Sequence, residues 1–325
     1  MISEAWRQIA IELYAAGGMR PYEVHKKLTE ELGYSLTKDQ VRGVIRRFKE
    51  KLESAEVTYK LATDEKRITL QNQEPNRVDS KWDGTQTIKF ALISDTHIGS
   101  KYTQLTYLHD FYDLCVKQGV TDIYHSGDLT EGLRMRLGHE YELYEVSADD
   151  MRDDVIKNYP MRPGVTTHFI TGNHDASIYK QVGYDIGQAI ANARPDMNYL
   201  GRDCAVVNLT PNCPMELRHP WDGMSYAMSY RPQKMIEAME SDSKPKILVI
   251  GHYHKAFYLF YRNVHCFLGG CFQAQTPFER GKGISVHLGG WIVELEVDSE
   301  GTVQAIKPQF VPFYNSVKDD WKKWK

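Results

Sequence analysis

The stretch IKFALISDTH, residues 88–97, decides the fold of this 325-residue chain. Its first seven residues form a short, mostly apolar run bounded by polar residues, which predicts a buried strand. Asp95 and His97 follow directly where that strand ends. When strands alternate with helices, the sheet is of the α/β type and sites gather at the carboxyl ends of its strands. The stretch therefore predicts an α/β domain with its chemistry at one sheet edge.

The same pattern, an apolar strand that ends in polar residues, recurs three times along the chain. Strands are expected in TDIYHS from 121, VTTHFIT from 165 and KILVI from 246, with helical stretches near 103–118, 146–158, 181–193 and 232–240. The motifs that follow these strands are Gly127-Asp128, Gly172-Asn173-His174-Asp175 and Gly251-His252-Tyr253-His254. A glycine at the turn permits the tight bend that aims a ligand inward.

The side chains that converge in this way are those of a divalent-metal site. Carboxylates, imidazoles and a carboxamide oxygen are ligands that hard and borderline divalent ions accept. One such motif alone is weak evidence, because an aspartate can cap a helix and a histidine can be an ordinary surface residue. Four motifs in this order, each after an apolar strand, are a specific signal.

In these motifs the chain resembles the calcineurin-like metallophosphoesterases, whose pattern is D-x-H, G-D, G-N-H-[DE], a lone H and G-H-x-H. His219 is the only histidine between Asp175 and His252, so it takes the place of the lone H. The resemblance covers roughly residues 88–270. It implies an α/β four-layer sandwich, two mixed sheets flanked by helices, with two metal ions at the sheet edge.

The resemblance also implies a role for each motif residue. One metal ion is expected on Asp95, His97, Asp128 and His254, and the other on Asp128, Asn173, His219 and His252. A hydroxide between the two ions would attack phosphorus in line, and His174 would act as general acid with Asp175 orienting its ring. Mn²⁺ is the first expectation for both ions, with Fe, Zn, Ni and Mg as alternatives. The chain is thus expected to be a dimetal-dependent phosphoester hydrolase.

Two further segments bear on the substrate. After Gly127-Asp128 the chain lacks the Tyr-Val-Asp-Arg-Gly run of the Ser/Thr protein phosphatases, and with it their phosphate-gripping arginine. The start FALISDTHIGS resembles the nuclease subunit of the double-strand-break repair complex, and residues 260–285 are similar to part of the exonuclease (small) subunit of archaeal D-family DNA polymerase. That subunit has an oligonucleotide-binding barrel before its catalytic domain, whereas this chain has a helical head, which argues against a polymerase-subunit role.

We therefore expect a DNA exonuclease or endonuclease. A phosphatase or small-substrate phosphodiesterase is the alternative, and a DNA-bound replication or repair scaffold without activity is the third interpretation, against which the intact ligand set argues. A nuclease needs a basic or aromatic track beside its metals. The candidates, each of which could equally be ordinary surface, are Lys101, Arg134, Arg136, Arg280 and Lys282, with Tyr102, Tyr179 and Phe278 for stacking. His139 is interpreted as a loop histidine, with an approach to the substrate as the alternative. The histidines inside expected strands, His125, His168 and His265, are interpreted as core or sheet-surface residues.

Residues 1–53 are expected to fold separately as three short helices. Thr37 and Gln40 form a capping box before the third helix. The basic face of that helix makes Arg42, Arg46 and Arg47 the candidate nucleic-acid contacts of a helix-turn-helix-like docking domain. A solvated face of a helical bundle is the alternative. Residues 54–87 are interpreted as a linker or arm, and 88–325 as the catalytic domain.

Composition excludes several classes of protein. Forty Lys+Arg against 43 Asp+Glu exclude a uniformly basic nucleic-acid coat. Five cysteines without a CxxC pair predict neither a disulfide framework nor a zinc ribbon. No apolar run approaches the roughly 20 residues of a membrane helix. We expect a cytoplasmic protein with DNA as partner and no membrane association; a homodimer, and a protein partner at the head or the C-terminal tail, stay open.

Overall fold

The structure is a computed structural model that describes residues 5–17, 20–48, 75–240 and 244–325. The chain divides into two compact units, Met1–Glu74 and Pro75–Lys325. In the described part of the chain, no helix is both long enough and apolar enough to pass through a membrane.

The first unit is helical. It contains α1 (Ala5–Gly17), α2 (Pro21–Lys26), the π-helical turn η1 (Lys27–Glu31) and helical residues 38–48. The capping box forms as expected, with the Thr37 N–H donating to Gln40 Oε1 at 2.7 Å and the Gln40 N–H donating to Thr37 Oγ1 at 3.3 Å. The helices share one apolar core, built from Trp6, Ala10, Val24, Leu28, Val41, Val44 and Ile45.

The second unit contains two six-stranded sheets, one with the order β1-β6-β7-β8-β10-β9 and one with the order β12-β11-β2-β3-β4-β5. The strands are β1 (Asn76–Asp79), β2 (Thr87–Ile93), β3 (Asp122–Ser126), β4 (Thr166–Thr171), β5 (Met197–Arg202), β6 (Cys204–Thr210), β7 (Cys213–Arg218), β8 (Ile247–Ile250), β9 (Ala256–Tyr261), β10 (Val264–Gly269), β11 (Gly289–Val297) and β12 (Val303–Pro312). The helices are α4 (Leu105–Lys117), η2 (His139–Glu142), α5 (Ala148–Asn158), α6 (Asn173–Val182), α7 (Ile186–Ala193), α8 (Tyr230–Ala238), α9 (Pro277–Gly281) and η3 (Asp320–Lys323).

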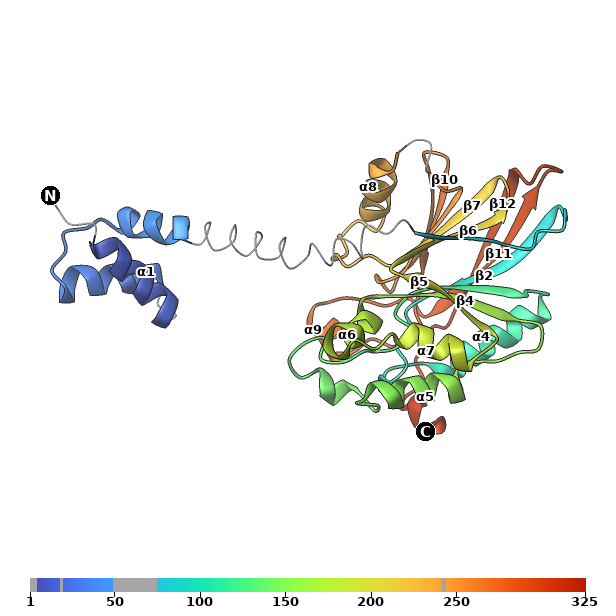
Figure 1. Cartoon of the computed structure of the whole chain (residues 1–325), viewed down its shortest axis with the longest axis horizontal. Helices are drawn as coiled ribbons and strands as arrows, with labels where there is room; N and C mark the ends of the chain where they lie inside the picture. Colours follow the sequence, from blue (N-terminus) through green and yellow to red (C-terminus); the bar gives the residue numbers. More distant parts are fainter. Residues whose placement is uncertain (1–4, 18–19, 49–74, 241–243) are drawn as a thin grey trace. The chain divides into compact units, whose positions relative to one another are not determined.

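The layers follow from the alternation of side chains along the strands. In β2, Ala91 and Ile93 point into a core shared with helices α4, α5, α6 and α7, whereas Phe90 and Leu92 point into the core between the two sheets. Helix α8 covers the outer face of the other sheet (Figure 1). Each sheet contains both parallel and antiparallel pairs. The expected α/β sandwich of two mixed sheets flanked by helices is confirmed.

The expected linker over 54–87 extends too far toward the catalytic domain. Residues 76–79 instead form β1, which pairs in parallel with residues 205–208 of β6. Side chains fix the strand further, because Ser80 Oγ donates to the Leu209 carbonyl of β6 and Asn76 Nδ2 to the Leu200 carbonyl of β5 in the other sheet, both at 2.7 Å. Three of the four β1 side chains are exposed, so this edge strand lacks the apolar pattern that predicts strands.

A candidate dimetal centre

The motif residues occupy strained turns directly after the strands. Five of them have a left-handed backbone, a conformation that costs a residue with a side chain roughly 1–2 kcal/mol; their φ angles are 53° at Asp95, 48° at His97, 55° at Asp128, 76° at His252 and 53° at His254. Backbone strain of this kind clusters at functional sites, where the surrounding structure enforces it. Hydrogen bonds between the turns do so here, since the Asp95 N–H donates to the Gly127 carbonyl at 3.0 Å.

Two motif glycines are required by close approach. A Cβ atom on Gly172 would lie 2.4 Å from Asp128 Oδ1, and one on Gly251 would lie 2.3 Å from the Ser126 carbonyl oxygen. Neither neighbour can move away without displacing the centre. These glycines therefore allow the four turns to pack against one another at one sheet edge.

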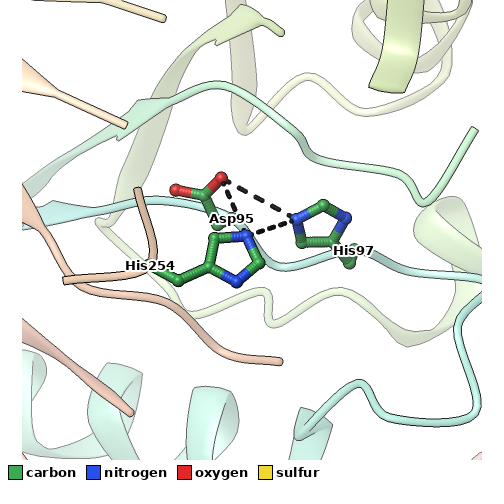
Figure 2. A group of neighbouring side chains, drawn as sticks. All are labelled: Asp95, His97 and His254. Atoms are coloured by element: carbon green, nitrogen blue, oxygen red, sulfur yellow. Dashed lines mark hydrogen bonds and ion pairs between the residues drawn. The ribbon is translucent and has the colours of Figure 1, made fainter. Parts of the chain in front are cut away.

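Asp95, His97 and His254 form the first group of donors (Figure 2). The Nε2 atoms of the two histidines lie 3.0 Å apart, and Asp95 Oδ1 lies 3.7 Å from His97 Nε2 and 3.4 Å from His254 Nε2. All three side chains are buried. Donor atoms from two distant strand ends thus surround one point.

Asp128, His219 and His252 form the second group. His219 Nε2 lies 3.1 Å from Asp128 Oδ2 and 3.1 Å from Asn173 Oδ1. Asp128 also approaches the first group, because its Oδ2 lies 3.9 Å from His97 Nε2. The carboxylate of Asp128 therefore connects the two groups, and all seven side chains expected to bind metal meet in this region.

Backbone carbonyls fix the orientation of two of the rings. His219 donates from Nδ1 to the Ser126 carbonyl at 2.7 Å, and His252 donates from Nε2 to the Asp222 carbonyl at 2.8 Å. Each bond determines the tautomer of its ring, so the other ring nitrogen keeps its lone pair and faces the donor group. Outer partners of metal-binding histidines generally have this effect.

Two carboxylates that the sequence did not single out fix the other rings. His97 Nδ1 lies 2.9 Å from Glu131 Oε2, and His254 Nδ1 lies 2.9 Å from Glu279 Oε1. A proton on Nδ1 of each ring, on the side of its carboxylate, would leave the lone pairs of the two Nε2 atoms facing each other. A sequence signal existed for Glu279, which with Thr276 forms the capping box of α9.

The charge balance of the centre calls for cations. Asp95 and Asp128 are buried, and in the described part of the chain the ion pairs of both carboxylates are with histidines, not with lysine or arginine. Burial alone would lower the pKa of His97, but Glu131 and Asp95 raise it to about 10. Burial would likewise lower the pKa of His219, but Asp128 raises it to about 9.

A divalent cation would balance the negative charge of the two buried carboxylates without protonation of the histidines. Lone pairs that face one another at 3.0 Å, as those of His97 and His254 do, repel unless a proton or a cation lies between them. Two carboxylates, four imidazoles and a carboxamide are a donor set that divalent ions accept. The residues present therefore fit two divalent cations, one on each donor group.

His174 lies beside the centre, as expected for the general acid. Its Nδ1 donates to the Glu131 carbonyl at 2.6 Å, and its ring centroid lies 4.6 Å from that of His97. The backbone N–H of His174 donates to Asp128 Oδ1 at 2.8 Å. With Nδ1 engaged, Nε2 is the ring nitrogen that can exchange a proton with a substrate.

The role expected for Asp175 is wrong. Its carboxylate accepts hydrogen bonds from the N–H groups of Gly172 at 2.9 Å, Leu129 at 3.1 Å and Thr130 at 2.8 Å, and from Thr130 Oγ1 at 2.7 Å. The ring of His174 is oriented by the Glu131 carbonyl instead. Asp175 ties two motif turns together, and its N3 position in helix α6 explains the hydrogen bond from the Gly172 N–H.

His139 is also placed differently from the expected loop histidine. It is fully buried at the start of η2, and its Nε2 lies 2.8 Å from Glu131 Oε1. Gln273 Nε2 donates to the other carboxylate oxygen of Glu131. His139 thus supports the glutamate that orients His97. His125 is buried in β3, as expected.

The expected basic and aromatic residues are only partly brought together. The guanidinium of Arg136 lies 4.2 Å, and the ammonium of Lys282 4.4 Å, from the ring centroid of Phe278. Lys101 instead donates to the Tyr141 carbonyl. In the first unit, all three candidate nucleic-acid contacts are exposed on the helical segment 38–48: Arg42, Arg46 and Arg47.

Comparison with solved structures finds similar proteins at low sequence identity. An archaeal phosphodiesterase is 12% identical, with 69% of this chain and 100% of that chain covered and a TM-score of 0.38. A predicted phosphoesterase from Streptococcus pneumoniae is 14% identical, with 70% and 99% covered and a TM-score of 0.36. Vps29 from Entamoeba histolytica, solved with zinc, is 12% identical, with 69% and 99% covered and a TM-score of 0.34. Comparison with curated proteins gave no match.

The family model described as calcineurin-like phosphoesterase matches residues 88–256. That range is more than half of the chain and contains every residue of the two donor groups, from Asp95 to His254. Taken together with the geometry of the centre, the match shows that the chain belongs to the calcineurin-like phosphoesterase family.

Proposed function

We propose that this chain is a dimetal-dependent nuclease that hydrolyses phosphodiester bonds in DNA. The observation that carries the proposal is the pair of buried donor groups joined by Asp128. Two metal sites of this kind are suited to in-line displacement at phosphorus, in which the attacking and leaving oxygens both need charge stabilisation.

The chain offers a complete set of ligands for two ions. Asp95, His97, Asp128 and His254 would hold one divalent cation, and Asp128, Asn173, His219 and His252 the other. When bound, such cations lower the pKa of water and neutralise charge on phosphoryl oxygens. Mn²⁺ is our first candidate, ahead of Fe, Zn, Ni and Mg, because the mixed N/O donors do not select one ion.

His174 would supply the proton to the leaving oxygen. Burial lowers the pKa of its ring, although Asp128 opposes the shift. A phosphodiester bound nearby adds a negative charge that favours the protonated ring. The Glu131 carbonyl holds Nδ1–H, so Nε2–H is the donor that faces outward from this bond.

The choice of DNA rests on the first unit and on the resemblance of residues 260–285. The guanidinium of Arg42 approaches Asp39 only to 3.9 Å and its side chain is 66% exposed. Arg46 and Arg47 are exposed one turn further along the same helical segment. Exposed arginines on a helix that follows a turn are typical contacts of phosphate backbones.

Cleavage assays test the proposal. Purified protein with Mn²⁺ is offered labelled single- and double-stranded DNA, para-nitrophenyl phosphate and its bis ester. Cleavage of DNA and of the bis ester is expected. Turnover of the monoester without cleavage of DNA would overturn the nuclease proposal in favour of a phosphatase, and no turnover with metal bound would favour a scaffold.

The role of the first unit is tested separately. Changing Arg42, Arg46 and Arg47 together to Glu should weaken binding to duplex DNA. The salt dependence of binding should also flatten, its slope falling by about 0.9 for each DNA phosphate that the variant no longer neutralises. Exchanging Arg20, Lys26 and Lys27 for Glu provides a control with the same change of charge over α2 and its two ends. Equal effects of the two triple changes would contradict a specific role for the 38–48 helix.

A further inference from the structure

Two aromatic rings that carry basic groups on their faces lie close in sequence to residues of the metal centre. The ammonium of Lys180 lies 3.6 Å from the ring centroid of Trp221. Arg136 and Lys282 lie 4.2 Å and 4.4 Å from that of Phe278. Both rings are large and apolar, yet Trp221 is 42% and Phe278 39% exposed.

Trp221 is anchored to the second donor group. It lies between His219, a proposed ligand, and Asp222, whose carbonyl accepts the ring N–H of His252. Its indole Nε1 donates to Asp203 Oδ1 at 2.9 Å, and the Asp203 carbonyl accepts the N–H of His219 at 2.7 Å. The indole therefore holds a fixed position beside this group.

Phe278 is anchored in the same way to the first donor group. It precedes Glu279, whose carboxylate lies 2.9 Å from His254 Nδ1. Thr276 caps this short helix, with its N–H donating to Glu279 Oε2 at 2.8 Å. Arg136, which covers the ring, is itself held by an ion pair with Glu142.

A second cation–aromatic pair extends the Trp221 side. Tyr179 precedes Lys180 on helix α6, its ring is 36% exposed, and the Arg202 guanidinium lies 3.7 Å from its centroid. Helix α6 begins at Asn173, a proposed ligand. Aromatic and basic side chains thus continue outward from the second donor group.

We propose that Trp221 and Phe278 are stacking platforms for the nucleobases on either side of the cleaved phosphate, and that the substrate is single-stranded DNA. Bases stack on aromatic side chains irrespective of sequence. A base that stacks on Trp221 or Phe278 would displace the Lys or Arg side chain from that ring face, and the displaced cation would then bind a neighbouring phosphate. Bases inside a duplex have both faces covered, so a base away from a strand end must be unpaired to use such platforms. This inference rests on the proposed function and specifies its substrate.

The test compares strands with and without bases. Steady-state cleavage with Mn²⁺ is measured on oligo(dT) and on an abasic oligonucleotide of the same length, for wild type, Trp221→Ala and Phe278→Ala. Each variant should lose about tenfold in kcat/KM on oligo(dT), mostly through KM, because one base stack is removed. The loss on the abasic strand should be much smaller, since that strand has no base to stack.

Phe260→Ala is the matched control. Phe260 is a 55% exposed aromatic on the edge strand β9, and removing it should leave both substrates unaffected. Equal losses of Trp221→Ala on both strands, or no loss on oligo(dT), would overturn the inference.

Binding of labelled oligo(dT) to metal-chelated protein separates this inference from the proposed function. If wild type hydrolyses para-nitrophenyl phosphate but neither binds nor cleaves oligo(dT), both fail. If wild type cleaves oligo(dT) and the variants keep full binding and cleavage, only the stacking inference fails. If wild type binds oligo(dT) without cleaving it and the variants bind about tenfold more weakly, the nuclease proposal fails, and single-stranded DNA is overturned as substrate, while stacking of bases on the two rings stands.

Discussion

Strand β3 has an aspartate near each end, and each aspartate pairs with a histidine. The two pairs differ in their exposure to solvent. At its amino end, Asp122 Oδ1 lies 2.9 Å from His168 Nε2, with the two side chains 43% and 18% exposed. Beyond its carboxyl end, Asp128 Oδ2 lies 3.1 Å from His219 Nε2, with the two side chains 1% and 0% exposed. An aspartate–histidine pair is thus partly exposed to solvent at the amino end of β3 and buried beyond its carboxyl end.

This difference separates a surface ion pair from a site that needs cations. Water screens the charges of Asp122 and His168, so their ion pair contributes little to stability and needs no cation to compensate it. Burial would raise the pKa of Asp128, but His219 and His174 hold it below its usual value. A charged carboxylate buried in this way must be compensated, and divalent ions are the natural partners of the donors around it.

The largest effect is expected from Asp128→Asn. The amide cannot supply the charge that both proposed ions share, so bound metal should be lost and diester turnover should fall by about 10³-fold or more. Metal analysis of the purified protein and the rate on bis-para-nitrophenyl phosphate measure this. Asp122→Asn makes the same chemical change at the other end of β3 and should leave both readings at the wild-type value.

His174→Ala should separate the chemistry from metal binding. Loss of a general acid lowers turnover by about 10²–10⁴-fold, whereas both donor groups stay intact and metal content should match that of wild type. Substrates with an activated leaving group, such as bis-para-nitrophenyl phosphate, should lose less than DNA does. A protein without metal would mean that His174 is a ligand instead.

Glu279→Gln should have an intermediate effect. The carboxylate that faces His254 Nδ1 fixes the ring and increases its basicity, and removing such a partner typically costs about 10–100-fold in metal affinity or activity. Titration of metal-free protein with Mn²⁺ measures the change. Glu294→Gln, a surface glutamate paired with Lys307, is the control; a similar loss there would show that Glu279 has no special role.

The smallest effect is expected from Asp122→Asn on the stability of the fold, because this change removes only the partly exposed pair of Asp122 and His168. The hydrogen bond from His168 lowers the pKa of Asp122, and that from Thr121 adds to the shift despite partial burial. A folded-state pKa below the unfolded value stabilises the fold above the unfolded pKa and ceases to do so as pH falls through the folded pKa. Asp122→Asn should therefore cost less than about 1 kcal/mol at pH 7.

Denaturant unfolding of wild type and Asp122→Asn at several pH values tests the sign of this prediction. The difference in unfolding free energy should shrink as pH falls below the ordinary aspartate pKa of 3.8. A difference that grows toward low pH would contradict the lowered pKa.

The residues of the centre were predictable because their signals are local. Four of the five ligand motifs, those that begin at Asp95, Gly127, Gly172 and Gly251, follow directly after an expected apolar strand, so the strand pattern itself brings them to one edge. His219 was instead assigned through the resemblance, and the strand before it, β7, was not predicted. Asp175 had a local signal too, its place three residues after Gly172 at the start of a helix, and that signal accounts for the hydrogen bond from the Gly172 N–H. Its hydrogen bonds from Leu129 and Thr130 span more than 40 positions and had no local signal.

The partners that orient the ligands were not predictable in the same way. Gln273 donates a hydrogen bond to Glu131 across 142 positions of sequence, and the periodicity of apolar residues does not predict such a contact. The pairing of Lys180 with Trp221 likewise depends on how α6 and the loop after β7 come together. Strand β1 escaped prediction because mostly exposed side chains give an edge strand no apolar pattern.

The central claim is that two divalent ions act together on the donors joined by Asp128. Titration of metal-free protein with Mn²⁺, followed by calorimetry and by the rate of diester cleavage in the same samples, tests it most directly. We predict two ions per chain, with cleavage appearing only as the second site fills. Full activity with one ion bound, or cleavage that persists in excess chelator, would contradict the account.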